Sequence, residues 1–206
     1  MQATMLEHIS KSSSDESIFK NLNPIVRTWF KSKFNEFSEP QRLAIPAIHK
    51  KENILVSAPT GSGKTLTAFT TILSELITLN EDNKLEDKVY CVYISPLKAL
   101  SNDVSINLIT PLKEMEALAG KTLGVRVAAR TGDTTASEKQ KMLKACPNIL
   151  ITTPETLAIL LTSIKFSLLL RNIQWCIVDE IHSLAENKRG THLSISLERL
   201  NQISPE

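Results

Sequence analysis

The segment Ala58–Thr65, Ala-Pro-Thr-Gly-Ser-Gly-Lys-Thr, constrains the possible folds of this chain more than any other feature. A short apolar run, Asn53–Ser57, precedes it, and Leu66, Phe69 and Leu73 follow it at helical spacing. A strand, a small-residue loop and a helix in that order present several backbone N–H groups and a helix N-terminus to one point. The sequence therefore predicts a phosphate-binding loop.

The residues of this loop suit a nucleoside triphosphate. Gly61 and Gly63 allow the backbone angles that such a loop requires. Lys64 would place its ammonium on the β- and γ-phosphates, and Thr65 would offer its hydroxyl to Mg²⁺. The alternative, a Gly-Ser turn that contains a lysine by chance, is disfavoured by the strand before the loop and the helix after it.

Composition narrows the class of protein without naming a function. The chain has 206 residues, 42% of them hydrophobic and 22% charged, which fits a soluble globular domain with its own core. The net charge of +2 does not indicate a nucleic-acid binder, so such a site would have to be local. No apolar run reaches the length of a membrane span. Three cysteines without a close pair give neither a disulfide framework nor a zinc pattern, and fit a reducing, cytoplasmic setting.

Short apolar runs alternate with helical patterns along the chain. The predicted strands are Asn53–Ser57, Val89–Ser95, Val125–Thr131, Asn148–Thr153 and Trp175–Asp179. Helices are predicted around 22–30, 41–49, 66–76, 97–115 and 135–144, from Pro154 onward, and around 191–203. This alternation predicts an α/β fold, a parallel sheet flanked by helices, with Cys91 and Cys176 buried in its strands. Residues 1–20 are predicted to be a polar leader, and residues 21–206 a single domain.

Chemistry in such sheets gathers where parallel strands end. The last predicted strand ends in Asp179-Glu180-Ile181-His182. Asp179 can hold Mg²⁺ through its water shell, and Glu180 can take a proton from an attacking water. The phosphate loop and this acidic pair together predict hydrolysis of ATP or GTP.

Three further strand ends combine hydroxyls, a Pro or Gly and the start of a helix: Ser95–Lys98, Arg130–Asp133 and Thr152–Thr156. Helix N-termini that carry hydroxyls hold phosphates well. One nucleotide cannot use all of them, whereas a polymer with phosphates in a row can. The alternative is that these hydroxyls only cap their helices.

These motifs resemble a known family. In order and spacing, Ala58–Thr65, Pro96–Leu100, Thr153–Thr156 and Asp179–His182 resemble motifs I, Ia, Ib and II of superfamily-2 helicases, with a box of the DExH type. Longer strings resemble the large helicase-related group: Ile94–Asp103, Arg130–Asp133, Ile149–Leu157 and Lys188–Leu193. The resemblance implies a RecA-like domain that couples ATP hydrolysis to movement on a nucleic-acid strand.

The resemblance also implies roles for single residues. Gln41 would read the adenine edge, with Phe34 packing on the base, so the nucleotide would be ATP. Glu180 would be the general base, and His182 would couple the nucleotide state to the nucleic acid. The implied nucleotide-binding residues are Gln41, Phe34, Thr60, Gly61, Ser62, Gly63, Lys64 and Thr65, with Thr65 and Asp179 at Mg²⁺.

For the nucleic acid, the resemblance implies contacts to phosphate and sugar of a single strand, with DNA favoured over RNA. The implied residues are Pro96, Lys98, Thr131, Gly132, Thr153 and Thr156.

Two departures from the family pattern stand out. Phe37 occupies a place that usually holds Pro. The family's Ser-Ala-Thr motif, on a strand expected between those of the phosphate loop and of Asp179, and its second RecA-like domain are not in these 206 residues. We therefore expect a fragment that binds ATP weakly and does not unwind a duplex. The alternatives are an RNA helicase of the DEAD/DEAH kind and a nucleotide-binding module without catalysis.

Overall fold

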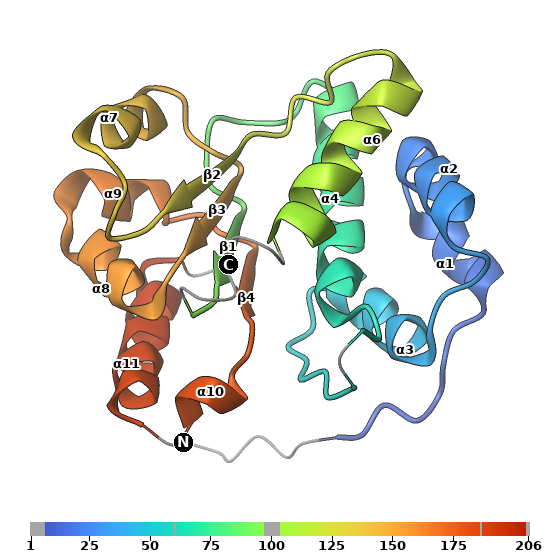
Figure 1. Ribbon diagram of the computed structural model, residues 1–206, viewed down its shortest axis with the longest axis horizontal. Coiled ribbons are helices and arrows are strands. Elements are labelled where there is room, and N and C mark those ends of the chain that lie inside the picture. Colours follow the sequence, from blue (N-terminus) through green and yellow to red (C-terminus); the bar gives the residue numbers. More distant parts are fainter. Residues whose placement is uncertain (1–6, 60, 97–103, 186, 205–206) are drawn as a thin grey trace. The chain divides into compact units, whose positions relative to one another are not determined.

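The computed structural model describes residues 7–59, 61–96, 104–185 and 187–204. The chain divides into two compact units, Met1–Glu75 and Leu76–Glu206, which are taken one at a time below. Figure 1 shows the elements of both.

Helices build the first unit, and three of them begin at a cap that the sequence supplies. Asn23 caps the helix that starts at Pro24, and Ser38 and Gln41 form a capping box at the next. Five rings from three of its segments, Phe19, Trp29, Phe30, Phe34 and Phe37, form an aromatic cluster. The helices are α1 (Asp15–Asn21), α2 (Pro24–Lys33), α3 (Glu39–His49) and α4 (Lys64–Glu81), the last of which continues into the second unit.

Helix α1 lies in the stretch for which the sequence predicts a polar leader. Its side chain Ile18 is only 2% exposed, and Ser14 caps its first turn. The stretch therefore ends in a packed helix, which the sparse apolar residues of 1–20 do not indicate.

A four-stranded parallel sheet forms the second unit, as the alternating pattern predicts. Its spatial order is β2 (Val127–Arg130), β3 (Ile149–Thr152), β1 (Cys91–Ile94), β4 (Trp175–Val178). Figure 1 shows α8 (Pro154–Thr162), α9 (Ile164–Leu169) and α11 (Lys188–Ile203) together beside the sheet. Val92, Ile94 and Leu150 pack against these helices, so even-numbered positions of β1 and β3 face this core.

The remaining elements of the second unit connect these strands. After the strand β1, residues 97–103 of the predicted helix lie outside the described residues, and the rest forms a π-helical turn and a helix. These elements are the π-helix Ser105–Ile109, α6 (Thr110–Ala119), α7 (Ala136–Lys144) and α10 (His182–Ala185). Neither α9 nor α10 was predicted.

One predicted strand is not formed. No ladder includes residues 53–57 among the described residues, and Leu55 is 71% exposed. An extended segment becomes a strand only when a neighbour satisfies its N–H and C=O groups, and apolar composition does not supply that neighbour.

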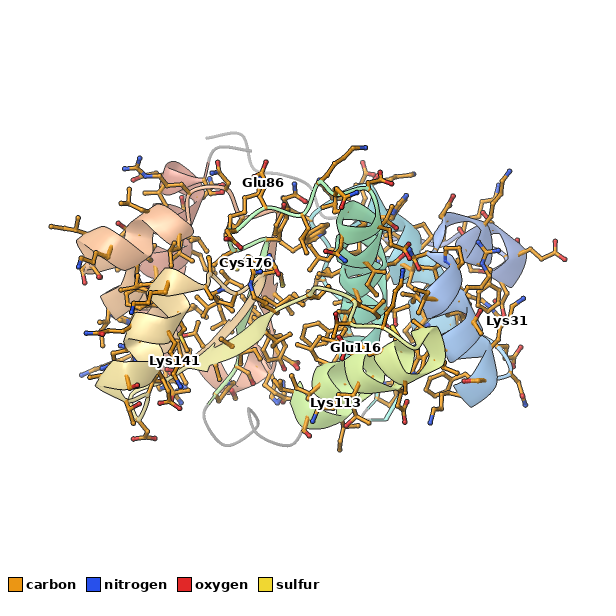
Figure 2. The ribbon with its side chains drawn as sticks, turned by 90° about the horizontal axis from the view of Figure 1, so that it is seen from above. Lys31, Glu86, Lys113, Glu116, Lys141 and Cys176 are labelled. Carbon is orange, nitrogen blue, oxygen red and sulfur yellow. The ribbon has the colours of Figure 1, made fainter. Side chains whose placement is uncertain are left out.

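The prediction for the cysteines is half right. Cys91 on the central strand β1 is buried, whereas Cys176 on β4, labelled in Figure 2, is exposed. The reason is position in the sheet: β1 has a strand on each side, and β4 pairs with β1 alone within the described parts of the chain.

Asn148 joins three segments of the second unit. Its Oδ1 accepts from the Arg126 N–H at 3.0 Å, and its Nδ2 donates to the carbonyls of Glu86 and Lys88 at 3.1 and 3.3 Å. The residue is 0% exposed.

Replacing Asn148 by Ala should lower the free energy of unfolding by about 2–3 kcal/mol, because buried backbone groups lose their partners. Urea denaturation measures this, and Asn201→Ala on the exposed face of α11 should stay within about 0.5 kcal/mol. Equal losses for both variants would contradict this role of Asn148.

Candidate nucleotide and nucleic-acid site

The two glycines of the predicted phosphate loop have the backbone angles that the sequence predicts. Gly61 and Gly63 have φ angles of +80° and +81°, which L side chains rarely adopt. Lys64 at the start of α4 donates from Nζ to the carbonyls of Ala58 at 2.5 Å and Pro59 at 3.0 Å. The lysine therefore lies over its own loop. Thr60 lies outside the described residues.

Gln41 lies against this loop. A Cβ at Gly63 would come within 2.7 Å of Gln41 Nε2, so the Gln41 amide lies close to the loop backbone, while the φ angle of Gly63 is what favours a glycine there. The Gln41 Oε1 accepts from the Ser38 N–H at 2.9 Å, which orients the amide. Ser38 Oγ in turn donates to the Ser62 carbonyl at 3.0 Å. The structure thus brings the predicted adenine-reading residue to the predicted phosphate loop.

Phe34 ends α2 and is 40% exposed. Its ring lies 4.8 Å from that of Phe30, so the aromatic cluster holds it while part of the side chain stays exposed. Phe37, which departs from the family pattern, is 1% exposed and stacks on Phe30 at 4.1 Å. A core role therefore accounts for a phenylalanine at this position.

In the second unit the strand ends form one row. Ile94 of β1 pairs with Thr152 of β3 and with Val178 of β4, and Thr152 pairs with Arg130 of β2. Because all strands are parallel and in register, the residues that follow them emerge at the same edge. These are Ser95 and Pro96, Thr131 and Gly132, Thr153, and Asp179 and Glu180.

Asp179 is held from two sides. Its Oδ2 accepts from the Tyr93 hydroxyl at 2.6 Å, and its Oδ1 accepts from the Glu180 N–H at 2.8 Å. Ile177 is the lateral partner of Tyr93, so alternation along β4 places Asp179 on the same face as that ring. The carboxylate is therefore fixed at the strand end, on the face away from the core formed by α8, α9 and α11.

Glu180 occupies an unusual backbone region, with a φ angle of +52°. Such an angle is uncommon for a residue other than glycine and marks a sharp change of direction. This turn lets consecutive residues of a strand serve one site, as the sequence requires of Asp179 and Glu180. Glu180 Oε2 lies 3.1 Å from His182 Nε2, so the two predicted site residues Glu180 and His182 are in contact.

The hydroxyls at the start of α8 make local bonds. Thr153 Oγ1 accepts from the Thr156 N–H at 3.3 Å and lies 3.0 Å from Thr156 Oγ1. The two residues are 5% and 3% exposed. In this conformation their side chains cap the helix, which is the alternative that the sequence left open.

The other predicted strand-contacting residues differ in accessibility. Gly132 is exposed, Thr131 and Pro96 are half-buried, and the Thr131 N–H donates to Thr134 Oγ1 at 2.9 Å. Lys98 lies outside the described residues. Among the described residues of this set, Gly132 is therefore the most accessible.

Arg130 is a residue whose role the sequence did not indicate. It is 7% exposed, it donates to the Thr131 carbonyl at 2.5 Å, and its guanidinium lies 5.8 Å from the ring centre of Phe166. Burial lowers the pKa of this guanidinium. Its position near the end of a predicted strand was the available signal, and no separate role was predicted for this arginine.

The chemistry of these donors suits Mg²⁺, which prefers hard oxygen ligands and keeps several waters. Asp179 offers a fixed carboxylate and Thr65 a hydroxyl, each in its own unit. No cluster of three or more His, Cys, Asp or Glu side chains that could hold a metal occurs in the described ranges. The same ranges contain no helix long and apolar enough to cross a membrane.

Comparison with known proteins agrees with these features. A family model described as DEAD/DEAH box helicase matches residues 38–206. The chain is 55% identical over 204 residues to the ATP-dependent helicase Lhr-Core of Methanocaldococcus jannaschii, covering 97% of this chain and 24% of that protein. It is 56% identical over 190 residues to the Lhr-Core helicase of Saccharolobus solfataricus, covering 92% and 22%.

A solved structure, of the Mycobacterium smegmatis helicase Lhr bound to ssDNA and AMP-PNP, is similar at a TM-score of 0.79 and 38% identity. The match covers 91% of this chain and 24% of that one. The chain thus spans about a quarter of the length of these relatives.

The bond from Tyr93 to Asp179 can be tested by its effect on magnesium. Tyr93→Phe removes only the hydroxyl, so the Mg²⁺ concentration that gives half-maximal ATPase activity of the full-length protein should rise about tenfold. Tyr90→Phe is a matched control, because the Tyr90 hydroxyl is also buried but accepts from the Glu86 N–H. An unchanged magnesium dependence in Tyr93→Phe would contradict this supporting role.

Proposed function

Because this chain belongs to the DEAD/DEAH box helicase family, we propose that it is the ATP-binding motor domain of an ATP-dependent nucleic-acid helicase or translocase. The identity to Lhr-Core helicases supports a place in the large helicase-related group. One observation carries the proposal: the acidic pair Asp179-Glu180 ends its strand in the same row as the segments that follow β1, β2 and β3. Such a row places the acidic pair for hydrolysis beside loops that can contact successive phosphates of an extended nucleic-acid strand.

In this proposal the nucleotide is ATP. The loop 58–65 holds its phosphates through backbone N–H groups and Lys64. Gln41 recognises the adenine edge and Phe34 packs on the base. The location of the Gln41 amide beside Gly63 supports this role, since a residue that reads the base has to lie close to the loop that holds the phosphates. Thr65 and Asp179 would hold Mg²⁺, which supplies positive charge to the phosphate oxygens.

The hydrolytic step requires a group that accepts a proton from the attacking water. Glu180 is proposed as this general base, and its carboxylate is partly exposed, so water can reach it. His182 contacts Glu180 at 3.1 Å and lies further out, with 78% of its side chain exposed. That placement supports a role in relaying a change at Glu180 to a bound strand.

Single-stranded DNA is the proposed substrate. The support is that the similar helicase Lhr of Mycobacterium smegmatis was solved with ssDNA, and that MrfA, 28% identical, was solved with DNA. Contacts would go to phosphate and sugar, through Pro96, Thr131 and Gly132, through the N-terminal turn that Thr153 and Thr156 cap, and through Lys98.

The whole protein's activity would need more than this segment. We propose that a second RecA-like domain completes the site and supplies a finger arginine, which contributes large rate factors in such hydrolysis. The 206 residues alone would then bind ATP weakly and would not unwind a duplex. Duplex unwinding by the purified chain would refute this.

Glu180→Gln in the full-length protein tests the general base. The variant should lose about a hundredfold or more of ATP turnover and keep its affinity for ATP, because only the proton acceptor is removed. Steady-state ATPase kinetics and nucleotide binding measure the two quantities. Glu198→Gln, an exposed change on α11, should leave both unchanged, and normal turnover in Glu180→Gln would exclude the assignment.

Stimulation of the ATPase separates DNA from RNA. Single-stranded DNA should raise the turnover of the full-length protein more than RNA of the same sequence and length. The reverse order would favour an RNA helicase of the DEAD/DEAH kind. No ATP turnover with either polymer would favour a nucleotide-binding module without catalysis.

A further inference from the structure

Asp15 of helix α1 makes two hydrogen bonds to the segment that carries Gln41. Its Oδ1 accepts from Arg42 Nε at 2.6 Å, and its Oδ2 accepts from the Phe37 backbone N–H at 3.1 Å. One bond lies on each side of Gln41 in the sequence. The hydrogen bond from Arg42 lowers the pKa of Asp15, so this carboxylate is charged at neutral pH.

Further contacts of the N-terminal residues stabilise this arrangement. The Ser13 N–H donates to the Arg42 carbonyl at 3.2 Å, and the Phe19 ring of α1 lies 4.8 Å from that of Phe37. Lys31, labelled in Figure 2, lies 4.6 Å from the centre of the Phe19 ring. Backbone, ion-pair and ring contacts thus join residues 13–19, which include the start of α1, to residues 37–42.

Residues 37–42, which Asp15 contacts, also touch the phosphate loop. Ser38 Oγ donates to the Ser62 carbonyl at 3.0 Å, and the Ser38 N–H fixes Gln41 Oε1 at 2.9 Å. With Oε1 so engaged, Nε2 faces Gly63. A continuous chain of contacts therefore runs from Asp15 through 37–42 to the loop, all within the first unit.

Residues 34–38 between α2 and α3 have no regular structure of their own. A hydrogen-bonding side chain discriminates between ligands only when it is held within about 0.5 Å of its productive position. Gln41 stands in the first turn of α3, directly after this connection, so its position depends on how the start of that helix is held. The two bonds from Asp15 restrain that start on both sides, at Phe37 before it and at Arg42 within it.

We propose that Asp15 is a positioning residue for adenine recognition, and that α1 is part of the nucleotide site although it touches no nucleotide. The proposal rests on the proposed role of Gln41. Asp15 acts on the base and not on the phosphates, so it should affect the affinity for ATP and the preference for adenine. It should not affect the hydrolytic step at Glu180.

The test uses the full-length protein with saturating single-stranded DNA. Asp15→Ala should raise KM for ATP about tenfold and leave kcat within about twofold, because only binding common to ground and transition states is lost. KM for GTP should stay within about twofold, since Gln41 makes no matched contact with guanine. Asp15→Asn, which keeps an acceptor for the Phe37 N–H, should show a smaller rise.

Two controls separate positioning from a general loss of structure. Glu16→Gln changes the neighbouring exposed carboxylate of α1 and should leave both KM values unchanged. Asp15→Ala added to Gln41→Ala should cause no further rise in KM for ATP, because the first residue acts through the second. Additive effects, equal rises for ATP and GTP, or a fall in kcat would overturn the proposal.

The same variants also show whether the premise, recognition of adenine by Gln41, is wrong. If Gln41→Ala leaves KM for ATP unchanged, Gln41 does not read adenine, and both the assignment and its support by Asp15 fall. If Gln41→Ala raises KM and Asp15→Ala does not, only the positioning role is wrong.

Discussion

The parallel, in-register pairing of β1 with β3 and β4 is the interaction on which the second unit depends. It puts Ile94, Thr152 and Val178 side by side, and β2 extends the row through Arg130. Parallel strands need long crossovers, so each end leads into a new loop at the same edge. Residues far apart in the sequence therefore become neighbours, and Asp179 and Glu180 share one row with the residues that follow β1, β2 and β3.

Close approach of backbone and side chain plays the corresponding role in the first unit. The amide of Gln41 lies close to Gly63, where an added Cβ would come within 2.7 Å of its Nε2. The capping box that starts α3 also orients this amide through Ser38, so one local motif both begins a helix and aims a recognition group. Asp15 extends that support to the N-terminal helix α1, which links a polar stretch of sequence to the chemistry of the base.

Much of the fold and of the candidate site could be predicted because it depends on residues close together in the sequence. Periodicity located the four strands of the sheet within a few residues, and two helix starts, at Thr135 and at Pro154, were also predicted. The loop at 58–65, the acidic pair and the glutamine were all identified as chemical groups. The prediction failed at residues 53–57, where strand formation depends on a partner, at Cys176, whose exposure depends on its place in the sheet, and at α1, where one buried Ile18 anchors a polar helix.

By itself the sequence determined where the candidate groups lie: a glycine-rich loop before a helix and an acidic pair after a strand, with Gln41 added by the resemblance to helicases. The tertiary structure alone decided what holds those groups in place. Tyr93 meets Asp179 across 86 positions, and Asp15 meets Phe37 and Arg42 across 22 and 27. Such partners are chosen by strand order and helix packing, and these depend on contacts distant in the sequence, which a local pattern of residues does not encode.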